Sequence, residues 1–540
     1  MAEKRKGVPD RRANRVILRR TLCLAALFGI GTFSMLIWKL WQIQIVNQDF
    51  YETKAIEQQT SDLAVSAKRG TIYDSQGQIL AISATAYNVI LSPRDLARVQ
   101  AEYEERPDSD RPAPTNEYLA AGLSELLGTD SETLIKRMER DYSAYEVLAS
   151  RVEEETAAKV RQFVLDNHLS NGLYVLPDAK RHYPYSSLAA QVIGFVNNEN
   201  QGAYGIEAAR ERELAGQRGR VITARTGSGT EMLSSYENYV DAVEGYNLHL
   251  TLDATIQYYA ERVLEDGIAR FEVRNGGFCV VMDPNTGAVY ALASSPDYDL
   301  NNPRTISDEA AAKQLEAMKN NPAVTEEEYL DALGQAQFKQ WWSKALNDTY
   351  EPGSTFKTLV LAAALEEGVV NESSTFYCSG SVQVPGWTIR CHKHGGHGSQ
   401  TLREVVMNSC NPAFVAIGQR LGAEKFYQYL EDFGIIGKTG IDLPEANNSN
   451  LVWSREYFTS EEGIASLAAA SFGQTFRLTP IQLATAASAA VNGGHLLQPY
   501  VVQSVEDENG NPVERHEVIE ARQVISEETS ALVRSILESV

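Results

Sequence analysis

An apolar segment near the N-terminus restricts the architecture of this chain more than any other feature. Residues 21–38 carry no charge and are rich in Leu, Phe, Ile, Ala and Gly, and apolar residues continue to Ile43. At about 1.5 Å per residue, a helix over 21–43 spans the hydrocarbon core of a bilayer. A cleaved signal peptide has a shorter apolar region that ends in small residues, whereas this one ends in Ile37-Trp38-Lys39. The sequence therefore predicts an uncleaved membrane anchor.

The charges around this segment predict its orientation in the membrane. Residues 1–20 hold eight Lys and Arg side chains against Glu3 and Asp10, and the positive-inside rule keeps such a basic head in the cytoplasm. The whole chain has a formal net charge of −22, and so acidic a bulk argues against binding to nucleic acid, which needs clustered Lys and Arg. We therefore expect a single-pass protein of the cell membrane whose bulk is extracytoplasmic.

The chain after the anchor divides into two parts. Its 540 residues exceed what one hydrophobic core usually serves. Residues 44–245 are mixed and irregular, with helical stretches near 116–128 and 154–168, and the pattern becomes regular from residue 246. The elements expected there are a strand at 248–252, an amphipathic helix at 254–271, a hairpin of 277–283 with 287–293, and a helix begun by Ser354. This order predicts an α+β fold with helices on an antiparallel sheet.

A serine and a lysine at the start of the last helix have the spacing of a nucleophile and its base. Ser354 and Lys357 precede the apolar run 359–365, and residues three apart on a helix are neighbours, with about 5–6 Å between their Cβ atoms. A lysine that is desolvated by apolar neighbours loses its proton more easily and then accepts one from a serine hydroxyl. The pattern therefore predicts a nucleophile and a base, although so short a pattern also arises by chance.

A second constellation follows at Ser409-Cys410-Asn411. A hydroxyl and a carboxamide that face the same cleft are suited to relaying a proton and holding a substrate carbonyl. The alternative is that Asn411 and Pro412 only cap a helix over 412–421. Taken by themselves, these residues favour the capping interpretation.

Three of the five cysteines, Cys378, Cys391 and Cys410, lie close to these residues in the sequence. Outside the cytoplasm a disulfide between two of them is allowed and leaves the third unpaired. A metal site is another interpretation, with the candidate ligands Cys378, Cys391, His392, His394 and His397. The spacing lacks the paired C-x-x-C of a strong zinc signature. The sequence favours a disulfide, then free thiols, and favours zinc least.

Taken together, these residues resemble the active-site motifs of the penicillin-binding proteins, and more narrowly those of the class B, transpeptidase-only branch. Ser354-x-x-Lys357 and Ser409-x-Asn411 match the first two motifs, and the basic head and single anchor are similar. Further matches, in family order, are Arg69-Gly70-Thr71-Ile72-Tyr73-Asp74, Arg181-His182-Tyr183-Pro184, Gly202-x-x-Gly205-Ile206-Glu207, Thr251-Leu252-Asp253, Asp283-Pro284-x-Thr286-Gly287 and Ser471-Phe472-Gly473-Gln474. The resemblance implies a penicillin-binding or serine β-lactamase-like transpeptidase domain at 246–540 on an elongated pedestal, or dimerisation-like, domain at 44–245.

The third motif of the family, Lys-Ser/Thr-Gly on an edge strand, has only a misleading match. Lys438-Thr439-Gly440 has the right letters but runs into Ile441-Asp442-Leu443-Pro444, where a proline would interrupt a pairing strand. In the family a similar Thr-Gly-Ile-Asp-Leu-Pro segment is structural. We therefore expect the catalytic motif beyond Val540 and a transpeptidase domain that is incomplete at its C-terminus. The family commonly has a Gly after Ser-Phe-Gly-Gln, where this chain has Thr475. It also commonly has a Gly after Leu-Pro, which is absent here before Glu445.

The resemblance implies a peptidoglycan D,D-transpeptidase. Ser354 would attack the carbonyl between the terminal D-alanines of a donor stem peptide with Lys357 as base, and an amine of a neighbouring stem would then take the acyl group. Ser409 would shuttle the proton with Lys357, and Asn411 would hold the donor amide. No cofactor or metal is needed, and β-lactams would acylate the same serine. The implied partners are stem peptides ending in D-Ala-D-Ala, the membrane, wall-polymerising glycosyltransferases and divisome-type proteins.

Two other classes of function remain open. The chain could be a non-catalytic scaffold of a wall-building complex, or a β-lactam sensor or serine β-lactamase, which share Ser-x-x-Lys but lack such a pedestal. Among transpeptidases, the sequence does not separate division, sporulation and elongation roles. Gln201-Gly202 with Gly205-Ile206-Glu207 favours the division or sporulation type.

Overall fold

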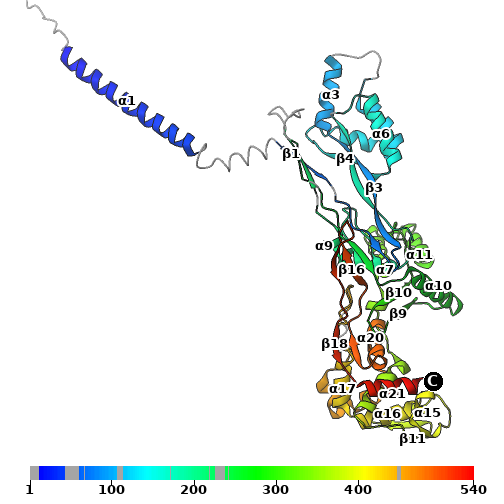
Figure 1. Cartoon of the computed structure of the whole chain (residues 1–540). Helices are drawn as coiled ribbons and strands as arrows, with labels where there is room; N and C mark the ends of the chain where they lie inside the picture. Colours follow the sequence, from blue (N-terminus) through cyan, green and yellow to red (C-terminus); the bar gives the residue numbers. More distant parts are fainter. Residues whose placement is uncertain are drawn as a thin grey trace, which may run out of the picture. The chain divides into compact units, whose positions relative to one another are not determined.

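The computed structural model of the chain contains two compact units (Figure 1). One unit is Met1–Val65 with Arg218–Asp241, and the other is Ser66–Gln217 with Ala242–Val540. The residues that the structure describes are 11–42, 60–65, 67–105, 113–170, 172–217, 219–224, 237–240, 242–446 and 452–540.

The first unit holds the predicted anchor and a small sheet. Helix α1 (Arg11–Trp41) includes Leu18–Trp41, which has a mean hydropathy of 1.9 and is long and apolar enough to cross a membrane. The helix begins inside the basic head rather than after it, and residue 43 of the predicted span lies outside the described residues. Three antiparallel strands form the sheet, in the order β1 (Thr60–Val65), β6 (Gly219–Ala224) and β7 (Glu237–Val240).

The pedestal part of the second unit is built on one long strand. Strand β3 (Ile79–Leu91) pairs antiparallel with β4 (Glu146–Val152) and β5 (Leu173–His182). Four helices, α3 (Pro93–Glu105), α4 (Asn116–Leu127), α5 (Ser131–Met138) and α6 (Glu154–Asp166), bury apolar side chains against this sheet. Helices α4 and α6 confirm the helical stretches expected from the sequence.

The same sheet continues into the transpeptidase part. Strand β2 (Ile72–Tyr73) pairs with β3 on one side and, in parallel, with β8 (Asn247–Leu250) on the other. Beyond β8 come β16 (Val502–Glu506) and β17 (Pro512–Arg515), both antiparallel to their neighbours. The predicted boundary at residue 246 therefore lies at the start of a strand whose partners come from both sides of it.

A buried ionic cluster joins three of the sequence motifs. The Glu207 carboxylate accepts hydrogen bonds from Arg69 Nε at 2.5 Å and from Arg181 Nε at 2.6 Å, and Tyr183 also donates to it. Arg69 Nη1 lies 2.6 Å from Glu211 as well. The side chains of Arg69, Arg181 and Glu207 are at most 1% exposed. The motifs of the pedestal therefore specify one charge-paired core rather than separate sites.

Two further carboxylates hold the loops next to strands β2, β8 and β16. Asp74 accepts the backbone N–H of Ala254, where α10 (Ala254–Arg270) begins. Asp442 accepts the N–H groups of Val501 and Val502 at 2.8 and 2.7 Å. The segment at Asp442 thus has a structural part, as the sequence resemblance implied.

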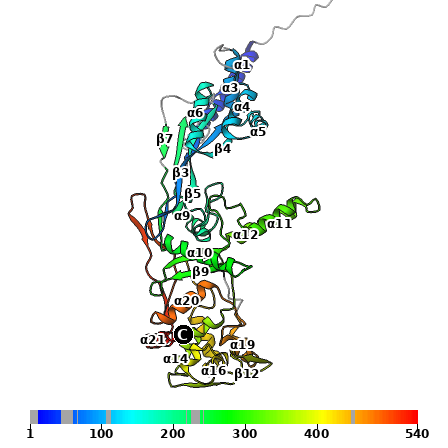
Figure 2. The same ribbon diagram turned by 90° about the vertical axis from the view of Figure 1, so that its right-hand side faces the viewer.

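The transpeptidase part combines a hairpin with a helical bundle. Strands β9 (Gly277–Met282) and β10 (Val289–Ser295) form the predicted antiparallel hairpin, and α10 lies against it in both views (Figure 1 and Figure 2). In the bundle, α14 (Lys357–Glu366) contacts α16 (Asn411–Leu421), α17 (Ala423–Asp432), α20 (Pro480–Val491) and α21 (Glu527–Leu537). The predicted α+β class is confirmed.

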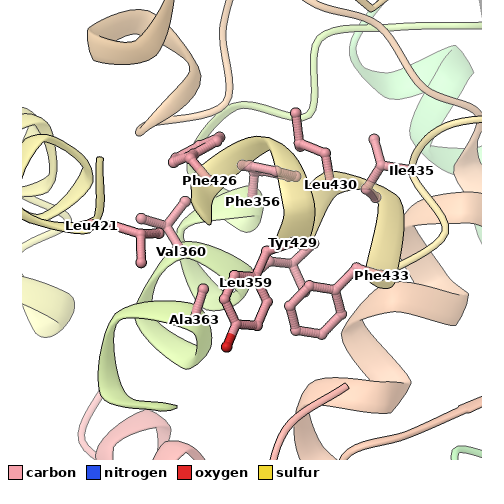
Figure 3. A pocket seen from close by; sticks show the side chains of 10 residues that line it. All are labelled: Phe356, Leu359, Val360, Ala363, Leu421, Phe426, Tyr429, Leu430, Phe433 and Ile435. Carbon is pink, nitrogen blue, oxygen red and sulfur yellow. The ribbon is translucent and has the colours of Figure 1, made fainter. Parts of the chain in front are cut away.

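Helix α14 is closely packed in the core of the bundle. Its residues 359–364 are all buried, and Figure 3 shows side chains from α14 and α17 facing one another around a cavity of only about 10 Å³. This space holds no more than about one water molecule. The side chains that line this cavity belong to the core, and their close packing supports the residues at the start of α14.

Candidate active site

Ser354 and Lys357 meet at a change of helix type. Residues Gly353–Phe356 form a 3₁₀ turn, and α14 begins at Lys357 itself. Because side chains three apart eclipse in a 3₁₀ turn, Lys357 Nζ comes within 3.1 Å of Ser354 Oγ. The sequence predicted this pair on an α-helical first turn, and the tighter turn brings the two groups closer. Ser354 is exposed, whereas Lys357 is 4% exposed.

The second constellation lies in the same site. Lys357 Nζ is 2.9 Å from both the backbone oxygen and the Oγ of Ser409, and 2.7 Å from Asn411 Oδ1. Ser409 Oγ is also 3.1 Å from Ser354 Oγ. Asn411 is the first residue of α16, and its Nδ2 donates to the backbone oxygen of Arg390 rather than capping the helix. The capping interpretation, which the residues alone favoured, therefore does not describe their contacts.

Ser409 has an unusual backbone conformation. Its φ angle is +45°, in the left-handed region that non-glycine residues rarely occupy. Hydrogen bonds from its own N–H to Val406 and from the N–H of Cys410 to Val405 hold this turn. The turn directs both oxygens of Ser409 at Lys357, and such strain is typical of functional sites.

Burial changes the acidity of the lysine. Removal from water lowers the pKa of Lys357 to about 8, although Cys410 and Cys391 act in the opposite direction. The neutral form of the amine, which is a minority near physiological pH and increases toward pH 8, has a lone pair for the Ser354 proton and keeps N–H groups for Ser409 and Asn411. The site therefore has the two groups, a serine hydroxyl and a partly desolvated amine, that a serine–lysine nucleophile requires.

The Ser471-Phe472-Gly473-Gln474 motif braces the nucleophile turn. The N–H of Gly353 donates to the backbone oxygen of Gly473 at 2.8 Å. A Cβ atom on Gly473 would lie 2.0 Å from the Gly353 oxygen, so only glycine allows this approach. The motif therefore acts on Ser354 through the backbone.

The next residue, Thr475, departs from the family pattern and is strained. Its φ angle is +70°, a genuine outlier for a β-branched residue, while its N–H donates to Glu351. We expect Thr475→Gly to raise the free energy of unfolding by about 1 kcal/mol, because glycine keeps the N–H and relieves the strain. Thr475→Ala keeps a Cβ at the same φ and is the control. Urea denaturation compares the three proteins, and equal stability of the Gly and Ala variants would contradict this assignment.

Lys438 does not lie on an edge strand. It is exposed, and Thr439 and Gly440 form a loop whose N–H groups donate to the Glu445 carboxylate. The Glu445 side chain thus closes this loop.

The cysteines form a group that the sequence predicted only in part. All five are free thiols in the structure, and Cys378, Cys391 and Cys410 come together with His397. His392 and His394 are not members of this group. The sequence predicts Cys410 only as a disulfide partner, and its position inside the Ser409-Cys410-Asn411 motif is the signal that connects it to the active site.

The fold and the site define a class of α+β proteins that carry a serine–lysine pair at the start of a buried helix. Residues 277–540 match the model of the penicillin-binding protein transpeptidase domain, and residues 64–250 match that of the penicillin-binding protein dimerisation domain. The chain therefore belongs to the penicillin-binding protein family, in its class B branch.

Named relatives agree with this membership. Stage V sporulation protein D of Bacillus subtilis is 33% identical over 98% of this chain and 74% of its own length. Peptidoglycan D,D-transpeptidase MrdA of Escherichia coli is 28% identical over 90% of this chain and 74% of its own. A crystal structure of penicillin-binding protein 2X from Streptococcus thermophilus covers 89% of this chain and 66% of that one at 20% identity, with a TM-score of 0.64, and supports the fold.

Proposed function

We propose that this protein is a peptidoglycan D,D-transpeptidase that cross-links stem peptides through an acyl-enzyme on Ser354. The observation that carries the proposal is the position of Lys357 Nζ, which lies within hydrogen-bond distance of Ser354, Ser409 and Asn411. Family membership and relatives named as D,D-transpeptidases support it.

Acylation follows from this geometry. Neutral Lys357 takes the proton of Ser354 as Oγ attacks the carbonyl between the two terminal D-alanines of the donor. The N-terminus of α14 stabilises the oxyanion that develops. The proton then passes to the leaving amine through Ser409, whose hydroxyl lies 2.9 Å from Lys357 Nζ, and D-alanine departs.

Transfer reverses the proton path. The amine of an acceptor stem attacks the ester carbonyl, gives its proton to Lys357 through Ser409, and Ser354 leaves with that proton. Asn411 keeps Lys357 in place through Oδ1, and its Nδ2, which donates to Arg390 in the structure, would exchange that bond for one to the donor amide. A β-lactam acylates the same serine as its ring C–N bond breaks, and because the leaving amine stays attached to the acyl group, this acyl-enzyme is displaced less readily.

The membrane topology, the biological role and the partner proteins complete the proposal. We infer that α1 anchors the protein with its N-terminus in the cytoplasm and its bulk outside, as the basic head indicates. The resemblance to stage V sporulation protein D favours a role in sporulation. Wall-polymerising glycosyltransferases would supply the glycan strands that this site cross-links.

The two alternatives fit less well. A serine β-lactamase or sensor does not need the pedestal that residues 64–250 provide. A pure scaffold does not need a buried lysine that is shared among two serines and an asparagine.

Cross-linking of nascent peptidoglycan tests the proposed activity. Full-length protein, incubated with glycan strands made by a glycosyltransferase, is expected to release D-alanine and to form dimeric stem peptides. Ser354→Ala should abolish both products, whereas Ser373→Ala, at an exposed serine after α14, should retain them. Dimers formed by Ser354→Ala would overturn the proposal.

A further inference from the structure

Four side chains that are suited to binding a metal ion, three cysteines and one histidine, lie together beside the active site. The proposed transpeptidase reaction does not use them. The Sγ atoms of Cys378, Cys391 and Cys410 and a ring nitrogen of His397 all lie within 4.8 Å of one another. Cys391 Sγ is 3.4 Å from His397 Nδ1. All four residues lie between positions 378 and 410, and strand pairing together with the start of a helix brings their ligand atoms to one point.

The spacing fits a tetrahedral zinc ion. Zinc binds sulfur at about 2.3 Å and imidazole nitrogen at about 2.0–2.1 Å, which places tetrahedral ligand atoms about 3.5–3.8 Å apart. The Cys391–His397 distance of 3.4 Å is close to this range, and the other pairs of ligand atoms are at most 4.8 Å apart. Three thiolates with one imidazole form a ligand set that suits zinc rather than the oxygen-preferring Mg²⁺ or Ca²⁺.

The scaffold around the four residues is built to hold them. Cys378 ends β11 (Thr375–Cys378), which pairs with β14 (Gly398–Thr401), and Cys391 follows β13 (Trp387–Arg390). A Cβ atom on Gly396 would lie 2.2 Å from the Cys378 oxygen, so the turn that carries His397 can pass Cys378 only because residue 396 is glycine. Cys410 precedes the first residue of α16.

Hydrogen-bond donors surround the sulfurs. The backbone N–H groups of His397 and Gly380 donate to Cys378, and that of Ala413 donates to Cys410. The side chain of Gln400 is 3% exposed and also donates a hydrogen bond toward the Cys410 sulfur. Donors in this position stabilise metal-bound thiolates and orient them.

We propose that Cys378, Cys391, His397 and Cys410 bind one structural Zn²⁺ ion, which fixes the turn that carries the second active-site motif. Cys410 stands between Ser409 and Asn411, so a bond from its sulfur to zinc holds both neighbours by their backbone. The ion is four-coordinate with protein ligands alone, which leaves no position for substrate. It positions the catalytic residues and does not react.

The metal content of the purified protein tests this site independently of transpeptidase activity. Full-length protein, purified under reducing conditions without chelator, should contain about one zinc ion per chain by plasma mass spectrometry. Cys378→Ser, Cys391→Ser and His397→Ala should lose it. Cys279→Ser, on β9, and His394→Ala, beside the group but outside it, should keep it. Gln400→Ala should weaken zinc binding by about 10–100-fold.

Two measurements on the unmodified protein keep the test valid if a variant fails to fold. Cobalt added after chelation should give the absorption bands of a tetrahedral thiolate site, and zinc should restore the melting temperature and the rate of acylation by penicillin, whereas Mg²⁺ should not. A protein that binds neither zinc nor cobalt, or that carries a disulfide between two of the three cysteines when isolated from its own membrane, would overturn the proposal.

Discussion

Replacement of Lys357 by alanine should slow acylation by penicillin about 10²–10⁴-fold, because this is the usual contribution of a positioned general base. The amine is 3.1 Å from the serine oxygen that it must deprotonate. Stopped-flow measurement of acylation by a fluorescent penicillin gives the rate. Circular dichroism and the melting temperature establish that the variant is folded.

The pH profile of the unmodified protein tests the same role. Burial lowers the pKa of Lys357 to about 8, so the neutral, reactive form increases as the pH rises through 8. The acylation rate should therefore fall about tenfold per pH unit below 8 and level off above it. Lys438→Ala, at the exposed lysine of the misleading motif, should leave both rate and profile unchanged. A flat profile, or a Lys357→Ala variant that reacts at the unmodified rate, would contradict the assignment of the base.

Glu207→Gln should destabilise the pedestal by about 3–5 kcal/mol, because it leaves the two buried arginines Arg69 and Arg181 without their shared counter-charge. Gln is nearly the same size as Glu, so the change removes the charge with little change in packing. The midpoint of urea unfolding, followed by intrinsic fluorescence of the full-length protein, reports the loss.

A neighbouring carboxylate provides the control for this prediction. Glu211 also pairs with Arg69, but its side chain is 35% exposed. Water screens its charge, and Glu211→Gln should cost about 1 kcal/mol or less. Equal destabilisation by the two substitutions would show that the buried pairing is not what holds the three pedestal motifs together.

The sequence predicted the local elements well because their patterns are short-range. Apolar periodicity and turn residues located the hairpin of β9 and β10 and helix α10, and the uncharged run located α1. The serine–lysine pair was also predictable, since both groups lie within one turn.

Contacts between distant segments were not predictable from the residues alone. The roles of Ser409 and Asn411 depend on a turn with a left-handed φ, which serine rarely adopts, so local preference favoured a helix cap. Cys410 lies far from Cys378 in the sequence, and only the pairing of β11 with β14 and the packing of α16 bring them together. The pairing of Arg69 with Glu207 likewise depends on the fold.

Identification of the residue that carries the acyl group tests the central claim most directly. Full-length protein treated with benzylpenicillin, digested and analysed by mass spectrometry is expected to show one penicilloyl adduct, on the peptide that contains Ser354, and the adduct should be absent after Ser354→Ala. An adduct on another residue, or one that persists in Ser354→Ala, would contradict the account.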